Sequence, residues 1–494
     1  MSRGRLFRVT GAMAVAVAVI VLVGVGAGGS GCVFYLNPQC TDLIHNGDET
    51  DIDCGGTCGK CNVGDRCNAD ADCDESTCSN GRCVPLPCAN GVKDGEETDI
   101  DCGGPTCHKC AGARSCAAGG DCFSGMCVAA TRTCFSLPTV SFASAVSYPS
   151  GNKGYALFAG DLDGDGDLDL AAANELDSQI AVFVNNGAGV FTRLTPITTG
   201  AYPTGGAIID MNRDGIADVV TADYHGNSVS VLLGLGGRTG MLAAKTSYAT
   251  VPGAETSNLA VGDLNGDGNP DVVATNPLSS SVSEFLGHAD GTLDPAIDLP
   301  VGIIGASAPY SAAIGDFDGN GTNDLAIADS QSGTIVVRLG NGDGTFQTEV
   351  PYREGGVSPY ILITRDINRD GHLDLVCANR SSDDVSVLLG RGDGAFRKPI
   401  VSSTGKGTGP YSIDVADFNQ DGAPDVITAN YKSSTASVLL GVGDGSFEAV
   451  LDTGPTGQVS YGVATGDFNK DGKPDFATAN AISNDVTVRL STSH

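Results

Sequence analysis

The stretch DLDGDGDLD, from Asp161 to Asp169, places five carboxylates and two glycines within nine residues of an otherwise apolar, strand-like sequence. A single solvated turn could have this composition, because Asp and Gly are favoured in turns. The pattern returns six times, however, as DMNRDGIAD, DLNGDGNPD, DFDGNGTND, DINRDGHLD, DFNQDGAPD and DFNKDGKPD. This recurrence indicates a structural unit rather than an isolated turn.

All seven copies keep oxygen-bearing residues at alternate positions. Positions 1 and 9 are Asp, positions 3 and 5 are Asp or Asn, and position 6 is Gly. Turn chemistry does not require this spacing, whereas calcium takes about six to eight oxygen ligands and glycine lets the chain curl around the ion. We therefore expect the side chains of positions 1, 3, 5 and 9 and the carbonyl of position 7 to converge on one ion per loop. The expected ligand residues are Asp161, Asp163, Asp165, Asp167, Asp169, Asp210, Asn212, Asp214, Ile216, Asp218, Asp263, Asn265, Asp267, Asn269, Asp271, Asp316, Asp318, Asn320, Thr322, Asp324, Asp366, Asn368, Asp370, His372, Asp374, Asp417, Asn419, Asp421, Ala423, Asp425, Asp467, Asn469, Asp471, Lys473 and Asp475.

An EF-hand is the obvious alternative for an acidic loop of this kind. It requires Glu at position 12 and helices on both sides. Position 12 is instead Ala172, Thr221, Ala274, Ile327, Cys377, Thr428 and Thr478. The flanking segments alternate with period two and carry no helical stripe, so the loops are predicted to connect strands.

The loops recur with a period near fifty, at spacings of 49, 53, 53, 50, 51 and 50 residues. An apolar alternating segment such as YSAAIGDF precedes each loop, and two further extended segments, a Gly-rich turn such as NGDGTF and a fourth extended piece follow it. Four short strands per repeat are typical of a propeller blade, and seven blades can close into a ring. The sequence therefore predicts an all-β fold, a seven-bladed β-propeller of four-stranded blades over residues 139–494.

The acidic loop followed by a Gly-Asp-Gly-x-Phe turn resembles the FG-GAP and VCBS-type repeats of integrin α-subunit propellers and many bacterial surface proteins. The resemblance covers about 350 residues. It implies the calcium ligand set given above. We expect up to seven structural ions, because each would add roughly 1.4 kcal/mol to folding at about ten times its dissociation constant. It also implies that the propeller face remote from the loops receives a partner.

The last repeat lacks an outer strand. Phe191, Phe346, Phe396 and Phe447 each lie 30 residues after the first Asp of their loop, and the seventh counterpart would fall beyond His494. The segment FASAVSY, which begins at residue 142, matches FQTEVPY of the fourth repeat. We therefore expect residues 139–149 to pair with NDVTVRLS and close the ring, which removes an open sheet edge.

A second periodicity lies six residues before each loop. The residues there are Tyr155, Thr204, Ser257, Tyr310, Tyr360, Tyr411 and Tyr461. Six residues of strand span about 20 Å, so these side chains are predicted to circle the channel mouth remote from the loops. The five tyrosines are either a packing layer or a contact surface for protein or sugar.

The formal charge of −31, from 59 acidic and 28 basic residues, argues against nucleic acid as a partner. Seven calcium ions would reduce it to about −17.

The N-terminus predicts export. Three arginines precede the apolar segment GAMAVAVAVIVLVGVGAGG, so residues 1–31 are interpreted as an export signal, with a membrane anchor as the alternative. Cys32, which follows small residues, resembles the lipid-bearing cysteine of bacterial lipoproteins. Residues 32–39 are then a linker. The expected location is the cell surface, the outer membrane or the extracellular space, with membrane contact only through this N-terminal signal or lipid.

Sixteen of the 18 cysteines lie between Cys40 and Cys134, in a duplicated motif. The two copies, residues 40–87 and 88–135, contain few large apolar side chains, so we expect eight disulfides to stabilise them in an oxidising compartment. Their shared ETDIDCGG resembles a Cys-rich repeat of secreted and surface proteins of myxobacteria and their relatives. A zinc site from the Cys-x-x-Cys pairs Cys58/Cys61 and Cys107/Cys110 is the alternative. Cys377 is predicted to be a buried free thiol.

These features together favour a non-enzymatic calcium-binding protein of adhesion or recognition, with a protein or glycan ligand at the propeller face. A carbohydrate-binding lectin is the first alternative and a polysaccharide lyase the next. We expect no catalytic residues, because all proposed metal ligands come from one loop each and no residue is kept aside to activate a water molecule.

Overall fold

The computed structural model describes residues 140–302 and 305–493, together with shorter stretches between 76 and 134. The chain divides into two compact units, Met1–Leu86 and Pro87–His494. The predicted export signal, the lipid-bearing Cys32, the linker and most of the first Cys-rich module lie outside the described residues, so these interpretations stay predictions.

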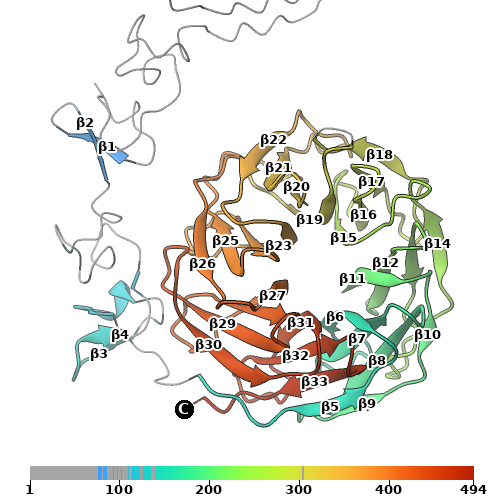
Figure 1. Cartoon of the computed structure of the whole chain (residues 1–494), viewed down its shortest axis with the longest axis horizontal. Helices are drawn as coiled ribbons and strands as arrows, with labels where there is room; N and C mark the ends of the chain where they lie inside the picture. The colour runs from blue at the N-terminus through green and yellow to red at the C-terminus, as the bar shows by residue number, and fades with distance from the viewer. Residues whose placement is uncertain are drawn as a thin grey trace, which may run out of the picture. The chain divides into compact units, whose positions relative to one another are not determined.

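Strands within residues 140–493 form seven antiparallel sheets around a central axis (Figure 1). This confirms the predicted seven-bladed propeller of four-stranded blades, with the outer strand of blade 1 divided into two short strands. The first three blades consist of β6 (Gly154–Gly160), β7 (Asp169–Asn174), β8 (Gln179–Asn185), β9 (Phe191–Arg193) and β10 (Ile197–Thr198); β11 (Pro203–Ile209), β12 (Asp218–Asp223), β13 (Ser228–Leu232) and β14 (Thr246–Ala249); and β15 (Leu259–Gly262), β16 (Asp271–Asn276), β17 (Ser281–Phe285) and β18 (Ile297–Pro300). The next three consist of β19 (Pro309–Gly315), β20 (Asp324–Asp329), β21 (Thr334–Arg338) and β22 (Val350–Arg353); β23 (Pro359–Arg365), β24 (Asp374–Asn379), β25 (Asp384–Leu388) and β26 (Ile400–Ser403); and β27 (Pro410–Ala416), β28 (Asp425–Asn430), β29 (Thr435–Gly441) and β30 (Phe447–Pro455). Blade 7 contains β31 (Ser460–Gly466), β32 (Asp475–Asn480), β33 (Asp485–Arg489) and, from the other end of the propeller sequence, β5 (Val146–Pro149).

The hydrophobic core lies between neighbouring blades. In every blade the second strand is buried along its whole length, because its two faces pack on different neighbours. Seven apolar clusters result, one for each pair of adjacent blades. Short alternating strands are therefore stable here, since each blade covers the apolar face of the next.

The ring closes through the pairing of β5 with β33. Tyr148 lies opposite Val486 and Val146 opposite Val488, and an isolated bridge joins Phe142 to Ser491. The Phe142 ring packs edge-on against Phe476 with ring centroids 4.8 Å apart. This is the partner strand that the match between FASAVSY and FQTEVPY predicts.

Each blade also contains a buried polar residue that the sequence reasoning missed. It stands five residues after position 9, at the end of the second strand, and is Asn174, Asp223, Asn276, Asp329, Asn379, Asn430 or Asn480. In blade 6 the Asn430 amide donates to Ser437 Oγ at 2.8 Å, and in blade 7 the Asn480 amide donates to Thr487 Oγ1 at 2.9 Å. These bonds fix the turn between the second and third strands. The recurring motif D-x-x-x-x-[ND], counted from position 9, could have revealed this residue in the sequence.

The described part of the second Cys-rich module is cross-linked by disulfides. They join Cys102 to Cys110, Cys116 to Cys127 and Cys122 to Cys134. A zinc site that includes Cys110 is thereby excluded, because its sulfur is in a disulfide. The short strands β3 (Cys127–Val128) and β4 (Thr133–Cys134) and the 3-10 turn η4 (Gly119–Asp121) accompany them, and the first unit contributes β1 (Ser76–Ser79) and β2 (Arg82–Pro85).

Two further observations concern the described residues alone. Cys377 is a buried free thiol in β24, as predicted. Among these residues, no helix has both the length and the apolar character needed to cross a membrane.

Candidate metal centre

Position 9 of every loop is a fully buried aspartate that opens the second strand of its blade. One carboxylate oxygen accepts the N–H of position 2, at 2.7–3.0 Å. The other accepts the N–H of the residue sixteen positions later, at the end of the third strand, at 2.6–2.8 Å. Position 9 therefore ties the loop to the sheet, a role that the sequence reasoning did not assign to it.

The remaining loop carboxylates and amides hold the turn in the same way in all seven copies. Position 1 accepts the N–H of the position 6 glycine at 2.8–3.0 Å. Position 3 accepts the N–H of position 5, and position 5 accepts that of position 7. Because each carboxylate oxygen has two lone pairs, these bonds leave capacity for an ion.

Glycine at position 6 is required by the backbone rather than by space. Its φ lies between 82° and 90° in all seven loops. A Cβ at Gly321 would meet no atom within 4 Å. Position 4, with φ between 54° and 76°, is occupied by Arg213, Arg369, Gln420 and Lys470 in four loops. The left-handed region near φ of about +60° admits such residues, whereas larger values favour glycine.

We therefore expect Gly321→Ala to destabilise the protein by about 1–2 kcal/mol in chemical denaturation. Gly319→Ala, at position 4 of the same loop, is the matched control and should cost clearly less. Equal costs for both variants would contradict this account of the turn geometry that the seven loops share.

The loop side chains converge on a small space. In the loops where position 3 is Asp, one ligand atom from each of positions 1, 3 and 9 lies within 4.8 Å of the other two: Asp161, Asp163 and Asp169 in blade 1, and Asp316, Asp318 and Asp324 in blade 4. Asp165, at position 5 of the first loop, is not part of its group. An all-oxygen donor set fits a hard cation such as calcium.

Burial and repulsion between neighbouring carboxylates raise the pKa of several loop aspartates. Burial raises the pKa of Asp169 and Asp475 to about 6 and that of Asp374 to about 7, against the backbone hydrogen bonds that lower it. In blade 6, burial and the charge of Asp421 raise the pKa of Asp417 to about 6. Keeping these groups ionised therefore destabilises the folded protein, and a bound cation would offset that destabilisation.

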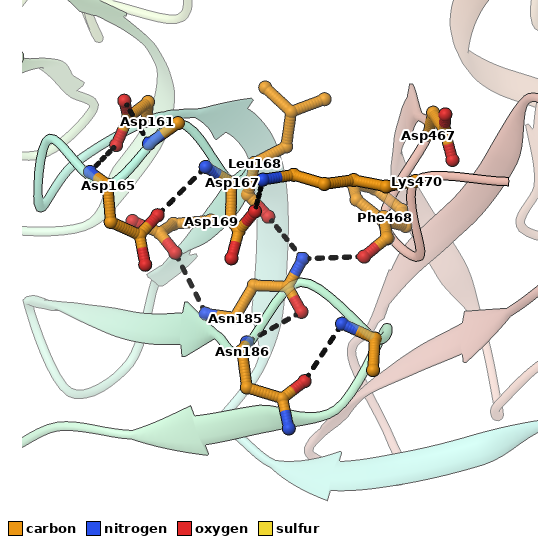
Figure 2. A network of polar contacts seen from close by, with 12 residues as sticks. Asp161, Asp165, Asp167, Leu168, Asp169, Asn185, Asn186, Asp467, Phe468 and Lys470 are labelled. Atoms are coloured by element: carbon orange, nitrogen blue, oxygen red, sulfur yellow. Dashed lines mark hydrogen bonds and ion pairs between the residues drawn. The ribbon is translucent and has the colours of Figure 1, made fainter. Parts of the chain in front are cut away.

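The loops also join neighbouring blades. The N–H of the second glycine in the Gly-Asp-Gly turn of one blade donates to the position 2 carbonyl of the preceding loop, as Gly344 does to Leu264 and Gly394 to Phe317. At the seam between blades 7 and 1, the Asn185 amide donates to the Phe468 carbonyl at 2.8 Å (Figure 2). The Gly189 N–H donates to the same carbonyl at 2.9 Å. An ion that orders a loop therefore also orders a boundary between blades.

Five segments, residues 161–221, 210–274, 263–327, 366–428 and 417–478, match the family model of the FG-GAP-like repeat, and together they span more than half of the chain. The chain belongs to the FG-GAP-like repeat family. No curated protein sequence is significantly similar to it.

Several solved structures are similar to this FG-GAP chain at low sequence identity. An Agrocybe aegerita lectin that recognises non-reducing terminal N-acetylglucosamine is 20% identical, with 68% of this chain and 85% of the lectin covered and a TM-score of 0.44. BBS1N in complex with ARL6DN is 12% identical, with 71% and 96% covered and a TM-score of 0.49. A virginiamycin B lyase from Staphylococcus aureus is 10% identical, with 70% and 99% covered and a TM-score of 0.47. Similarity at this level does not bear on what the FG-GAP protein binds.

The five tyrosines lie at the ends of the inner FG-GAP strands remote from the loops, and they pack against one another. The rings of Tyr360 and Tyr411 lie 4.3 Å apart, and those of Tyr411 and Tyr461 4.4 Å apart. The hydroxyls of Tyr155, Tyr360 and Tyr411 are hydrogen-bonded together. Tyr360 and Tyr411 are buried, so these two side chains serve as a packing layer. Tyr155, Tyr310 and Tyr461 stay partly exposed. His372, in the fifth loop, is exposed as expected.

A surface pocket of about 680 Å³ opens on this same remote face, over blades 6, 7 and 1 of the FG-GAP propeller. Its walls include Leu176 and Ile482, which are 54% and 63% exposed, and the rings of Tyr431 and Tyr461. We call it the tyrosine-face pocket. Sequence reasoning missed it because its residues come from turns of three different blades.

Proposed function

We propose that the chain is an exported, calcium-binding recognition module, that calcium holds its blades together, and that it has no enzymatic activity. The observation that supports calcium binding is the grouping of carboxylate oxygens within 4.8 Å in loops of one design. Three carboxylates and neutral oxygens per site suggest an affinity on the order of 0.1–1 mM, as in extracellular modules. The disulfides of the second Cys-rich module support an oxidising location at the cell surface or outside the cell, with Cys32 as the proposed lipid attachment.

The proposed recognition site is the tyrosine-face pocket. Large exposed apolar side chains gathered in one pocket are typical of interaction sites. Lys153 and Lys432 stand at its rim and keep 35% and 38% of their side chains exposed, whereas their partners Glu175 and Asp383 are 10% and 22% exposed. The lysines are therefore the more exposed members of both ion pairs, which suits a protein partner with apolar and acidic side chains.

A carbohydrate ligand is the second candidate. Tyr431 and Tyr461 stack with centroids 6.1 Å apart and planes 26° from parallel. Exposed aromatic faces of this kind offer contact surface to sugar rings.

One binding experiment tests both candidates. The calcium-loaded protein is screened against a glycan array and against extracellular protein extracts, and each hit is repeated with Leu176→Ser/Ile482→Ser. We expect affinity to fall at least about tenfold. Leu235→Ser, which alters a residue 58% exposed at the loop face, is the control and should bind normally. Equal binding by all three proteins would contradict the assignment of the pocket.

The stabilisation by calcium should depend on pH. The pKa of Asp374 is raised to about 7, and those of Asp169, Asp417 and Asp475 to about 6, above the ordinary value of 3.8. The folded metal-free protein thus binds protons more tightly than the unfolded chain, and these groups make it more stable as the pH falls from about 7.5 to 5. Calcium requires the ionised carboxylates, so it must displace those protons.

The gain in melting temperature between calcium-stripped and calcium-saturated protein should therefore shrink from pH 7.5 to pH 5.5. Scanning calorimetry of dialysed samples measures it without a chelator, whose own affinity depends on pH. A gain that grows at low pH would contradict the assignment of these acids to the metal site.

A further inference from the structure

The first loop carries more negative charge than the other six. It has Asp at both position 3 and position 5, whereas every other loop has one Asn there. That Asn donates its amide to the neighbouring carboxylate, as Asn212 does to Asp214 and Asn320 to Asp318, both at 2.9 Å. The first loop lacks this bond, and burial together with the charge of Asp165 raises the pKa of Asp163.

A lysine from the neighbouring blade faces this loop. Lys470, at position 4 of the seventh loop, forms an ion pair with Asp167 across the seam between blades 7 and 1 (Figure 2). The Asp167 side chain is only 9% exposed, whereas that of Lys470 is 55% exposed. Because Asp167 is expected to bind calcium through its backbone carbonyl, this pair leaves the ligand side chains free.

Position 4 has the same reach at other boundaries. The Gln420 amide donates to the Gly472 carbonyl of the next loop at 2.7 Å. Arg213 lies against the next loop as well, since a Cβ at Gly268 would be 3.0 Å from its Nη1. The positive charge of Arg369 lowers the pKa of Asp417, in the following loop, against the burial that raises it. The pair at the seam is thus one case of a contact between successive loops.

We propose that Lys470 is an intramolecular counter-ion that holds the acidic loop of blade 1 against blade 7 in the metal-free protein, and that calcium makes this contact redundant. The strands β5 and β33 join the two ends of the propeller sequence within blade 7. Lys470 and Asp167 come from the same two ends, so a metal-independent tie between them keeps the ring closed when calcium is scarce. Only the second half of the proposal rests on the proposed calcium binding. In the loaded protein the ion itself neutralises the loop, and the ammonium adds little.

The test is a double-mutant cycle on the full chain, with and without calcium. Lys470→Gln removes the charge, keeps an unbranched polar side chain and copies Gln420 of the sixth loop, which has the same left-handed backbone conformation. In calcium-stripped protein we expect its melting temperature to fall by about 1–3 °C. In saturating calcium it should equal that of the wild type. Lys470→Gln should have no further effect in the Asp167→Asn background, because the carboxylate that pairs with the lysine is already gone.

Lys406→Gln is the matched control, because it removes an exposed lysine from a turn at the remote face. It should melt like the wild type in both conditions. Wild-type stability of Lys470→Gln without calcium would overturn the proposal. An equal loss with and without calcium would overturn its second half. If the wild type itself does not respond to calcium while Lys470→Gln is still destabilised, the counter-ion stands and the proposed calcium binding fails.

Discussion

Stripping calcium from the purified protein should lower its melting temperature by about 10–15 °C. At about ten times the dissociation constant each ion contributes roughly 1.4 kcal/mol, or on the order of 10 kcal/mol for seven independent sites. A propeller of about 350 residues converts that free energy into a shift of this size. Calorimetry in excess EGTA and in millimolar calcium at pH 7.5 measures it.

Two control measurements show whether the stabilisation is specific to calcium. Restoring calcium should recover the original midpoint, and magnesium at the same concentration should recover little of it, because magnesium demands a tighter octahedral arrangement than these loops offer. Equal recovery by both ions would mean that general screening of the acidic chain, rather than a coordinated ion, stabilises the fold.

Deleting residues 136–150 should yield insoluble protein. The deletion removes β5 and leaves β33 as an open edge whose N–H and C=O groups have no partner strand. Open edges of this kind promote association between chains. Expression followed by fractionation and size-exclusion chromatography tests it, and a soluble, monomeric deletion product with a cooperative melt would contradict closure by this strand.

Two point substitutions separate the loss of side-chain packing from the exposure of a strand edge. Phe142→Ala removes the ring that packs on Phe418 and Phe476 and should cost about 3 kcal/mol. Val146→Ala, in β5 itself, alters a residue that is 51% exposed and should cost less than about 1 kcal/mol. Chemical denaturation of the two variants gives both values.

The propeller could be predicted because the deciding residues lie close together in the sequence and recur. The loop spacing, the period near fifty and the match of Phe142 and Tyr148 to the fourth repeat were sufficient for blade number and closure. Contacts between loops could not be predicted, because they join residues about fifty or, at the seam, about three hundred positions apart. Lys470 and Asp167 are one example, and Asn185 with the Phe468 carbonyl is another.

The tyrosines show a different limit. Their spacing correctly placed them at the end remote from the loops, but it left the choice between a packing layer and a contact surface open. Tyr360 and Tyr411 are buried, which shows that these two belong to a packing layer. Their hydroxyl contact depends on how far the rings reach across the axis, which the sequence does not specify. The tyrosine-face pocket depends on Leu176 and Ile482, which stand in turns whose sequences otherwise differ.

The most direct test of the central claim is the amount of calcium that the protein holds. Protein dialysed against millimolar calcium, washed and analysed by elemental mass spectrometry, with titration calorimetry of the stripped form, counts the sites. The account predicts up to seven ions per chain, with binding reduced by one in Asp316→Ala/Asp318→Ala. A calcium content near zero, with no heat of binding, would contradict it.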